Sequence, residues 1–282
     1  NKRFSTTDQP WICMPDSILQ LPDYHTHTLL CQHAEGRPAD YVREAEKKAL
    51  PEIACTDHGP APENFDPQHR MIADSFTTYR QWVREARENA RCTVLFGVEA
   101  DYHEGCEVYL ADWLKREEFD LVLGSIHYIG LWDLWDPAKQ ALWTADDIFN
   151  AWNTYFGFVR QMAASRMYDV VAHLDLPKRT GLRPPDGRCR EIVLPVLDEL
   201  AAAGMGIELN TSGLLHPGRE IYPSVEILSW ARERDIPITF GSDAHTPQRV
   251  GADFDKAVEL ARAAGYTHSL RFSRRQKTLL PF

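Results

Sequence analysis

Histidines and carboxylates recur along this chain of 282 residues in short groups that could bind metal ions. The groups are His25-Thr-His27, Asp57-His58 and Asp243-Ala-His245, and further single candidates are Glu99, His127 and His173. In an extended segment, residues i and i+2 point to the same side, so two histidines at this spacing can reach one ion. Imidazole mixed with carboxylate suits zinc, manganese or iron better than calcium or magnesium, which prefer oxygen ligands.

The surrounding sequence predicts the elements that carry these residues. Short apolar, β-branched runs alternate with longer amphipathic stretches, which is typical of βα units around a parallel sheet. The predicted strands are residues 21–25, 52–57, 93–99, 121–127, 170–174, 206–210 and 237–243, with 270–272 as a possible eighth. The predicted helices are residues 39–49, 77–91, 107–118, 145–167, 191–203, 224–234 and 255–264. We therefore expect an α/β barrel formed by residues 21–282 as one domain, preceded by an N-terminal extension of residues 1–20.

The candidate ligands follow the predicted strands at their C-terminal ends. In a parallel barrel these ends lie on one face, where enzymes of this architecture place their chemistry. The number of candidate ligands exceeds the four that one tetrahedral ion needs. We therefore expect more than one ion and a carboxylate that bridges them. Two ions about 3.5–4 Å apart can activate water and hold the oxygens of a phosphoryl group during in-line displacement. The pattern therefore predicts hydrolysis of a phosphate ester.

Composition narrows the class of partner and the compartment. The chain has 31 Lys and Arg against 41 Asp and Glu, a formal charge of -10, which disfavours nucleic acid as a main partner. Its six cysteines are scattered and form no C-x-x-C pair, as in a cytoplasmic protein with reduced thiols. Neither a membrane-spanning run nor a secretory signal pattern is present, so we expect no membrane association. The oligomeric state cannot be inferred from the sequence.

Seven segments carry a family resemblance. They are D-Y-H-T-H-T-L-L-C-Q-H-A-E-G from Asp23, C-T-D-H-G from Cys55, G-V-E-A-D-Y from Gly97, G-S-I-H-Y from Gly124, A-H-L-D-L-P-K-R from Ala172, N-T-S-G from Asn210 and G-S-D-A-H from Gly241. In this order, over roughly residues 21 to 270, they resemble the PHP (polymerase and histidinol phosphatase) family. The likeness is greatest to its stand-alone histidinol-phosphatase branch.

The resemblance implies a distorted (β/α)7 TIM-like barrel with three divalent metal ions at the C-terminal ends of its strands. Carried over to this sequence, one ion would be held by His25, His27, Glu99 and Asp243, a second by Glu99, His127 and His173, and a third by His33, His58 and His245. The loop residue His33 enters this set only through the resemblance. Zinc, manganese and iron all remain possible.

The resemblance also implies an activity, namely hydrolysis of L-histidinol phosphate to L-histidinol and phosphate in histidine biosynthesis. In the catalytic machinery we place Glu99 as the bridging ligand, Asp57 as a residue that orients His58 or a bound water, and His245 as a ligand. For the phosphate we expect contacts from Arg70, Lys178, Arg179 and Arg183, although a solvated loop cluster is the alternative interpretation of the last three. Where the branch often carries a basic residue after N-T-S-G, this chain has Leu214-Leu215-His216, so His216 or Arg219 would have to substitute.

Other candidates concern the rest of the substrate. Asp101 or Glu35 could receive an ammonium group, and the aromatic residues Tyr102, Tyr128, Trp132 and Trp135 could stack on an imidazole ring or simply pack in the core. Residues 131–145, rich in tryptophan and acid, resemble a lid or substrate-binding insertion.

Three other functions remain open at this stage. A PHP-type phosphoesterase acting on nucleic acid or on another small phosphate ester would share every ligand, but a nuclease needs a basic, aromatic-lined channel. Residues 178–190 are the one basic cluster, and the net negative charge of the rest of the chain argues against a nuclease. An amidohydrolase would have a carboxylated lysine or an equivalent at the bridging position, where this chain has Glu99. A non-catalytic domain is disfavoured by the complete ligand set.

Overall fold

The computed structural model describes residues 21–129, 132–133, 143–185 and 187–282. The predicted N-terminal extension, residues 1–20, therefore lies outside the described residues. So do Trp135 and most of the predicted lid, residues 131–145.

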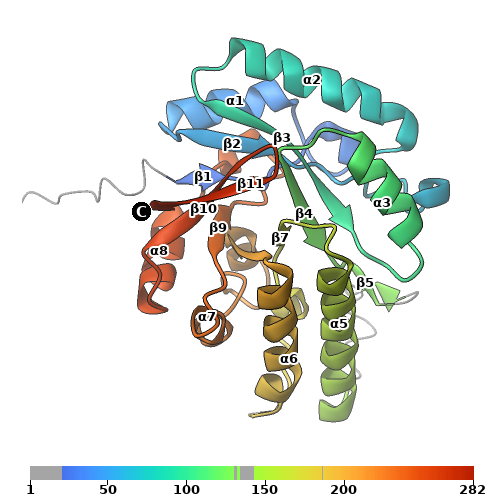
Figure 1. The fold of residues 1–282 in the computed structure, drawn as a ribbon, viewed down its shortest axis with the longest axis vertical. Helices are drawn as coiled ribbons and strands as arrows, with labels where there is room; N and C mark the ends of the chain where they lie inside the picture. Colours follow the sequence, from blue (N-terminus) through green and yellow to red (C-terminus); the bar gives the residue numbers. More distant parts are fainter. Residues whose placement is uncertain (1–20, 130–131, 134–142, 186) are drawn as a thin grey trace, which may run out of the picture.

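Seven parallel strands form the central sheet, in the order in which they follow one another along the chain (Figure 1). They are β1 (Pro22–Asp23), β2 (Glu52–Cys55), β3 (Thr93–Asp101), β4 (Leu121–Ser125), β7 (Val170–Val171), β8 (Gly206–Asn210) and β9 (Ile238–Gly241). The first and last strands meet, because the amide of Tyr24 donates to the carbonyl of Phe240 at 3.0 Å. A parallel bridge between Thr26 and Ala244 continues this contact. The predicted parallel barrel of seven strands is confirmed.

Helices cover the outside of the barrel (Figure 1). They are α1 (Pro38–Lys47), α2 (Phe76–Asn89), α3 (Glu107–Arg116), α5 (Ala145–Ser165), α6 (Arg188–Ala203), α7 (Val225–Arg232) and α8 (Phe254–Ala263). Each buries one apolar stripe at helical spacing; in α2 the stripe is Phe76, Tyr79, Val83 and Ala86. These helices confirm the seven that the periodicity predicts, with ends that differ by a few residues. No helix in the described part of the chain has the length and hydropathy needed to cross a membrane.

Short elements complete the fold. The 3-10 helices are η2 (Leu29–Cys31), η3 (Pro62–Asn64), η4 (Ala73–Ser75), η5 (Leu176–Thr180), η6 (Thr211–Leu215) and η7 (Pro247–Arg249), and β5 (Tyr128–Ile129) forms a small hairpin with β6 (Trp132–Asp133).

The possible eighth strand is a strand, but it does not belong to the barrel. β10 (His268–Ser273) pairs antiparallel with β11 (Gln276–Pro281) as a separate hairpin. The chain reverses there because Arg274 and Arg275 both adopt left-handed backbone angles, with φ of 47° and 64°.

The barrel interior has an apolar layer and a polar layer. Near the N-terminal ends of the strands, inward-facing residues form one apolar cluster with Leu270 and Phe272 of β10. They include Leu95, Leu121 and Leu123. Above them, toward the C-terminal ends of the strands, the inward positions become polar. The hairpin thus helps to fill the base of the barrel and leaves the opposite end for the candidate site.

Candidate metal centre

Glu99, near the end of β3, lies at the middle of the predicted ligands. Its side chain is 1% exposed. Its Oε2 lies 2.9 Å from Nδ1 of His58, 3.3 Å from Nε2 of His25 and 3.7 Å from Nε2 of His27. Its Oε1 lies 3.0 Å from Nε2 of His173 and 3.6 Å from Nε2 of His127. One carboxylate therefore faces five histidines from four different strand ends.

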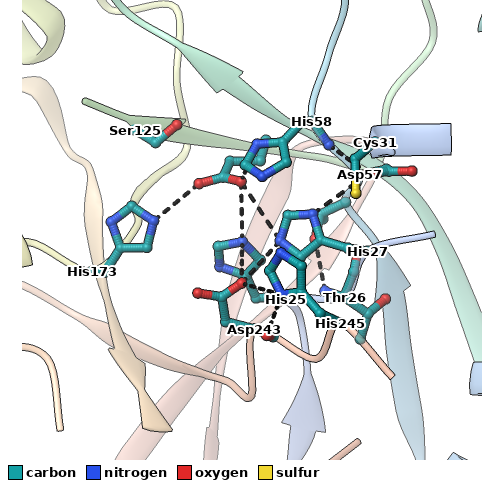
Figure 2. A network of polar contacts seen from close by, with 12 residues as sticks. His25, Thr26, His27, Cys31, Asp57, His58, Ser125, His173, Asp243 and His245 are labelled. Atoms are coloured by element: carbon teal, nitrogen blue, oxygen red, sulfur yellow. Dashed lines mark hydrogen bonds and ion pairs between the residues drawn. The ribbon is translucent and has the colours of Figure 1, made fainter. Parts of the chain in front are cut away.

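Asp243 is the second carboxylate of the cluster and follows β9. Its Oδ1 lies 2.9 Å from Nε2 of His27 and 3.6 Å from both Nε2 of His25 and Nδ1 of His245. Figure 2 shows its carboxylate next to these three imidazoles. The position of Asp243 thus allows it to share an ion with His25 and His27.

His33 comes from the loop after β1 and still reaches the cluster. Its Nδ1 lies 2.8 Å from the carbonyl of Cys31, which leaves Nε2 facing Nε2 of His245 at 3.0 Å. The ring centroids of His33 and His58 are 5.3 Å apart. The structure therefore brings together all three residues of the predicted third ligand group.

The donor set fits divalent metal ions. Buried His25 Nε2, which faces the carboxylates of Glu99 and Asp243, makes no hydrogen bond within the described residues. An unsatisfied buried polar atom costs about 1–3 kcal/mol, so such atoms are rare unless something else satisfies them. Several groups of three ligand atoms lie within 4.8 Å of one another, including those of His25, His27 and Glu99. Convergent imidazole and carboxylate donors of this kind form the usual environment of a divalent transition metal.

The carboxylates of the cluster carry charge, which the imidazoles around them help to balance. Burial raises the pKa of Glu99, but the nearby histidines His58, His25 and His127 outweigh it and hold that pKa well below its ordinary value. Burial likewise raises the pKa of Asp243, and His25 and His27 reverse the shift. Both carboxylates are therefore anionic at neutral pH, inside a barrel where an unbalanced charge is costly.

Asp57 lies behind the ligands. Its Oδ1 accepts a hydrogen bond of 2.9 Å from the backbone amide of His58 and lies 3.5 Å from Nδ1 of His27. The hydroxyl of Thr28 donates to its other oxygen. The carboxylate thus contacts the backbone of His58 and the imidazole of His27 (Figure 2).

A cavity of about 570 Å³ opens above the cluster. Three arginines line it, namely Arg70, Arg179 and Arg249. Besides the predicted ligands Glu99 and Asp243, the lining contains one acidic residue, Asp66. Asp66 accepts hydrogen bonds from the hydroxyl of Tyr128 and from Nδ1 of His69. The cavity therefore presents positive charge and a hydrogen-bonded carboxylate beside the metal ligands.

The predicted phosphate contacts separate into two groups. Arg70 and Arg179 line the cavity. Lys178 is 1% exposed and donates instead to the carbonyl of Ile221 at 2.7 Å and to Asp175 at 2.9 Å. Arg183 pairs with Glu220 at 2.5 Å and does not line the cavity. The positions of Lys178 and Arg183 thus give their expected phosphate role no support.

Arg249 is a cavity residue that the sequence reasoning missed. It lies in η7, four residues after His245, and pairs with Asp253 at 3.1 Å. Its short distance in sequence from the last ligand group was the available signal, because loops that follow barrel strands build the active-site face.

Asp101 is occupied by other groups and not open to an ammonium ion. It accepts from Arg70 Nη2 at 2.6 Å and from Ser125 at 3.0 Å, and lies 2.6 Å from Nδ1 of His127. Although burial raises its pKa, His127 and Arg70 hold that pKa well below its ordinary value. Asp101 therefore orients a predicted ligand. Glu35 is exposed and lies outside the cavity lining.

The remaining candidates also differ in position. Burial and the charge of Arg179 lower the pKa of His216 to about 4, so this cavity residue is neutral at pH 7 and supplies no positive charge. Arg219 donates to the carbonyl of Leu214 outside the cavity lining. Tyr102 is buried and donates to Glu107, whereas Tyr128 lines the cavity.

Comparison with known proteins places this geometry in context. A family model described as the PHP domain matches residues 23–212, and one described as PHP-associated matches residues 226–252. The chain is 36% identical to a "probable histidinol-phosphatase" of Deinococcus radiodurans, over 87% of this chain and 94% of that protein. It is 27% identical to the histidinol-phosphatase of Bacillus subtilis, over 86% and 99% of the two chains.

A solved structure has the same fold. It is the histidinol phosphate phosphatase of Lactococcus lactis in complex with zinc, L-histidinol and phosphate. The TM-score is 0.75 at 21% identity, over 92% of this chain and 99% of that one.

Proposed function

This chain belongs to the PHP domain family, and from that premise we propose that it is a metal-dependent phosphomonoesterase that hydrolyses L-histidinol phosphate to L-histidinol and phosphate. The observation that carries the proposal is the cluster of imidazoles and carboxylates at the floor of a cavity lined by three arginines. Relatives named as histidinol-phosphatases match most of the chain and support the same substrate. The reaction belongs to histidine biosynthesis, and we propose that it takes place in the cytoplasm.

The proposed centre holds three divalent ions, with zinc, manganese and iron as the candidate metals. The first ion has His25, His27, Glu99 and Asp243 as ligands; the second Glu99, His127 and His173; the third His33, His58 and His245. The distances from Glu99 to the histidines of the first two groups support its place as the bridge. When bound, such ions activate water and polarise the phosphoryl oxygens.

The residues of the chain then orient the substrate and balance its charge. Arg70 and Arg179 neutralise phosphate oxygens that the ions do not contact, and Arg249 is a third cation on the same cavity. Asp57 keeps the loop of His58 and the imidazole of His27 in place. Asp66 and Tyr128 form a polar group on the cavity wall that suits the amine-bearing part of the substrate.

The test is phosphate release from L-histidinol phosphate by zinc- or manganese-loaded protein, measured beside sugar phosphates, nucleotides and single-stranded DNA. We expect selective release from histidinol phosphate. Equal release from several phosphomonoesters would keep the phosphatase and remove the substrate assignment. Activity confined to phosphodiesters would support the alternative function, a PHP-type phosphoesterase that acts on nucleic acid.

A further inference from the structure

β8 is the one barrel strand without a predicted ligand at its end, but it carries a carboxylate. Glu208 lies in the middle of this strand, faces the barrel interior and has no exposed surface. Its neighbours Ile207 and Leu209 face outward into the apolar layer beneath the helices. Since an anion buried in a barrel is costly unless its partners compensate, the contacts of Glu208 need an explanation.

The strongest contact of Glu208 is with a predicted metal ligand. Its Oε1 lies 2.7 Å from Nδ1 of His25. The opposite nitrogen of that ring, Nε2, is the atom that faces Glu99 at 3.3 Å and Asp243 at 3.6 Å. A carboxylate bound to one nitrogen of a histidine keeps the proton there and presents the other nitrogen to a metal ion.

Its second oxygen reaches two further parts of the centre. Oε2 accepts from the backbone amide of His173 at 2.9 Å and from the side-chain amide of Asn210 at 3.0 Å. His173 has φ of 27°, in the left-handed region that is unfavourable for a residue with a side chain. The amide of Asn210 also lies 3.3 Å from Oδ2 of Asp243. One carboxylate therefore contacts His25 directly, supports the strained backbone of His173 and reaches Asp243 through an amide.

Glu208 packs tightly against the backbone of β9 at Gly241. A Cβ added to Gly241 of β9 would lie 1.9 Å from Oε1 of Glu208 and 2.7 Å from Cβ of His25. The absence of a side chain at position 241 thus allows the carboxylate and the imidazole to meet.

We propose that Glu208 is a positioning residue of the metal centre: its carboxylate keeps the proton of His25 on Nδ1, so that Nε2 is held ready for the ion. The inference rests on the proposed metal centre and is independent of which phosphate ester is hydrolysed.

The test measures metal retention instead of turnover. Zinc-loaded wild-type protein and the Glu208→Gln variant are dialysed against a graded series of chelator concentrations, and bound zinc is then measured by mass spectrometry. Glutamine keeps the size of the side chain but replaces one acceptor oxygen with a donor. We expect a 10- to 100-fold weaker hold on at least one zinc ion, the range typical for loss of a residue that orients a ligand.

The matched control is Glu52→Gln. Glu52 lies on β2 at the opposite end of the barrel, where its carboxylate is 3.5 Å from Arg271. We expect wild-type zinc retention from it. Folding of all metal-free proteins is compared by circular dichroism and urea unfolding. In cobalt-loaded protein, the visible absorption bands should change for Glu208→Gln and stay unchanged for Glu52→Gln, because those bands report ligand geometry.

Several outcomes would overturn the inference. Wild-type zinc retention by a folded Glu208→Gln protein would do so, and so would an equal loss in both variants, because Glu208 would then be structural only. If the glutamine variant does not fold, Glu208→Asp, which keeps the charge but draws it away from Nδ1, should show the same zinc loss. Failure of wild-type protein to retain zinc would overturn the metal centre itself, whereas failure to hydrolyse histidinol phosphate would overturn only the proposed substrate.

Discussion

At the scale of single residues, two arginines that the sequence predicts as phosphate contacts have different surroundings. Arg179 lines the cavity above the ligands, whereas Arg183, on the same loop, pairs with Glu220 outside it. A hydrogen bond to a charged group is worth about 1.5–3 kcal/mol, which corresponds to roughly 10- to 100-fold. We therefore expect Arg179→Ala to raise the KM for histidinol phosphate by about that factor and Arg183→Ala to leave it within about twofold. Similar steady-state constants for both variants would show that Arg179 does not hold the phosphate.

His216 supports a prediction about pH. Burial and Arg179 lower its pKa to about 4, whereas a histidine in the unfolded chain has an ordinary value near 6.5. Between these values the unfolded chain binds a proton that the folded protein does not, so the free energy of unfolding falls as the pH falls from about 6.5 to 4. Urea unfolding of metal-free protein should show this loss to be smaller in His216→Gln than in wild type. Parallel pH profiles would contradict the lowered pKa.

Strand periodicity indicated most of the predicted ligands, although His33 entered only through the family resemblance, and it did not indicate the residues that support them. His25, Glu99 and Asp243 stand out because strand periodicity brings polar residues to strand ends. Glu208 lies within the strand G-I-E-L-N, where the sequence pattern alone would equally fit a glutamate that faces solvent. Its contact with His25 in the structure shows that it faces the barrel interior. Lys178 is the opposite case, a residue that the sequence indicates and the structure does not support. Its place next to Arg179 predicts a phosphate contact, but its ammonium group is buried against Asp175.

At the scale of elements, the sequence predicted which strands form but not where their ladders end. β7 is two residues long although residues 170–174 read as a strand, because the backbone leaves the ladder before His173. Asp243 also lies beyond its strand, with φ of 51°. Hydrophobic pattern reports burial, and residues 172–174 stay as buried after the ladder ends as Val170 and Val171 are within it. Residues 270–272 were predicted as a possible eighth strand, but the pattern could not show that, among the described residues, this strand pairs only with β11, because its buried residues pack inside the barrel as a barrel strand's would.

The close approach of β9 to β8 supports a prediction about Gly241. A methyl group there would overlap the carboxylate of Glu208, and overpacking of this kind costs about 1–3 kcal/mol. We expect Gly241→Ala to lose at least that much free energy of unfolding in urea and to retain less zinc. The control is Gly157→Ala in α5, where an added Cβ meets nothing within 4 Å and alanine favours the helix by roughly 0.5–1 kcal/mol. Comparable destabilisation of both variants would contradict the packing argument.

At the scale of the whole molecule, the barrel joins distant parts of the sequence at one centre. An apolar layer that includes Leu270 and Phe272 of β10 fills one end of the barrel interior, and the predicted ligands lie at the other end, where the strands finish. Glu99 faces histidines that precede it by up to 74 residues and follow it by as many, so the centre exists only once the strands have paired. We therefore expect binding of the proposed ions to be coupled to folding.

This coupling predicts that removal of metal lowers the stability of the whole barrel. An ion that binds only the folded state at a free concentration one hundred times its Kd adds about 2.7 kcal/mol. For a domain of this size, that corresponds to a shift in Tm of roughly 5 °C. We expect chelator-treated protein to melt lower by about this amount in calorimetry and to recover on addition of zinc. Glu99→Gln should show a much smaller response, because it lacks the carboxylate that two of the proposed ions share. Equal melting of wild-type protein with and without zinc would mean that the cluster binds no ion in the folded state, and the proposed chemistry would then lose its basis.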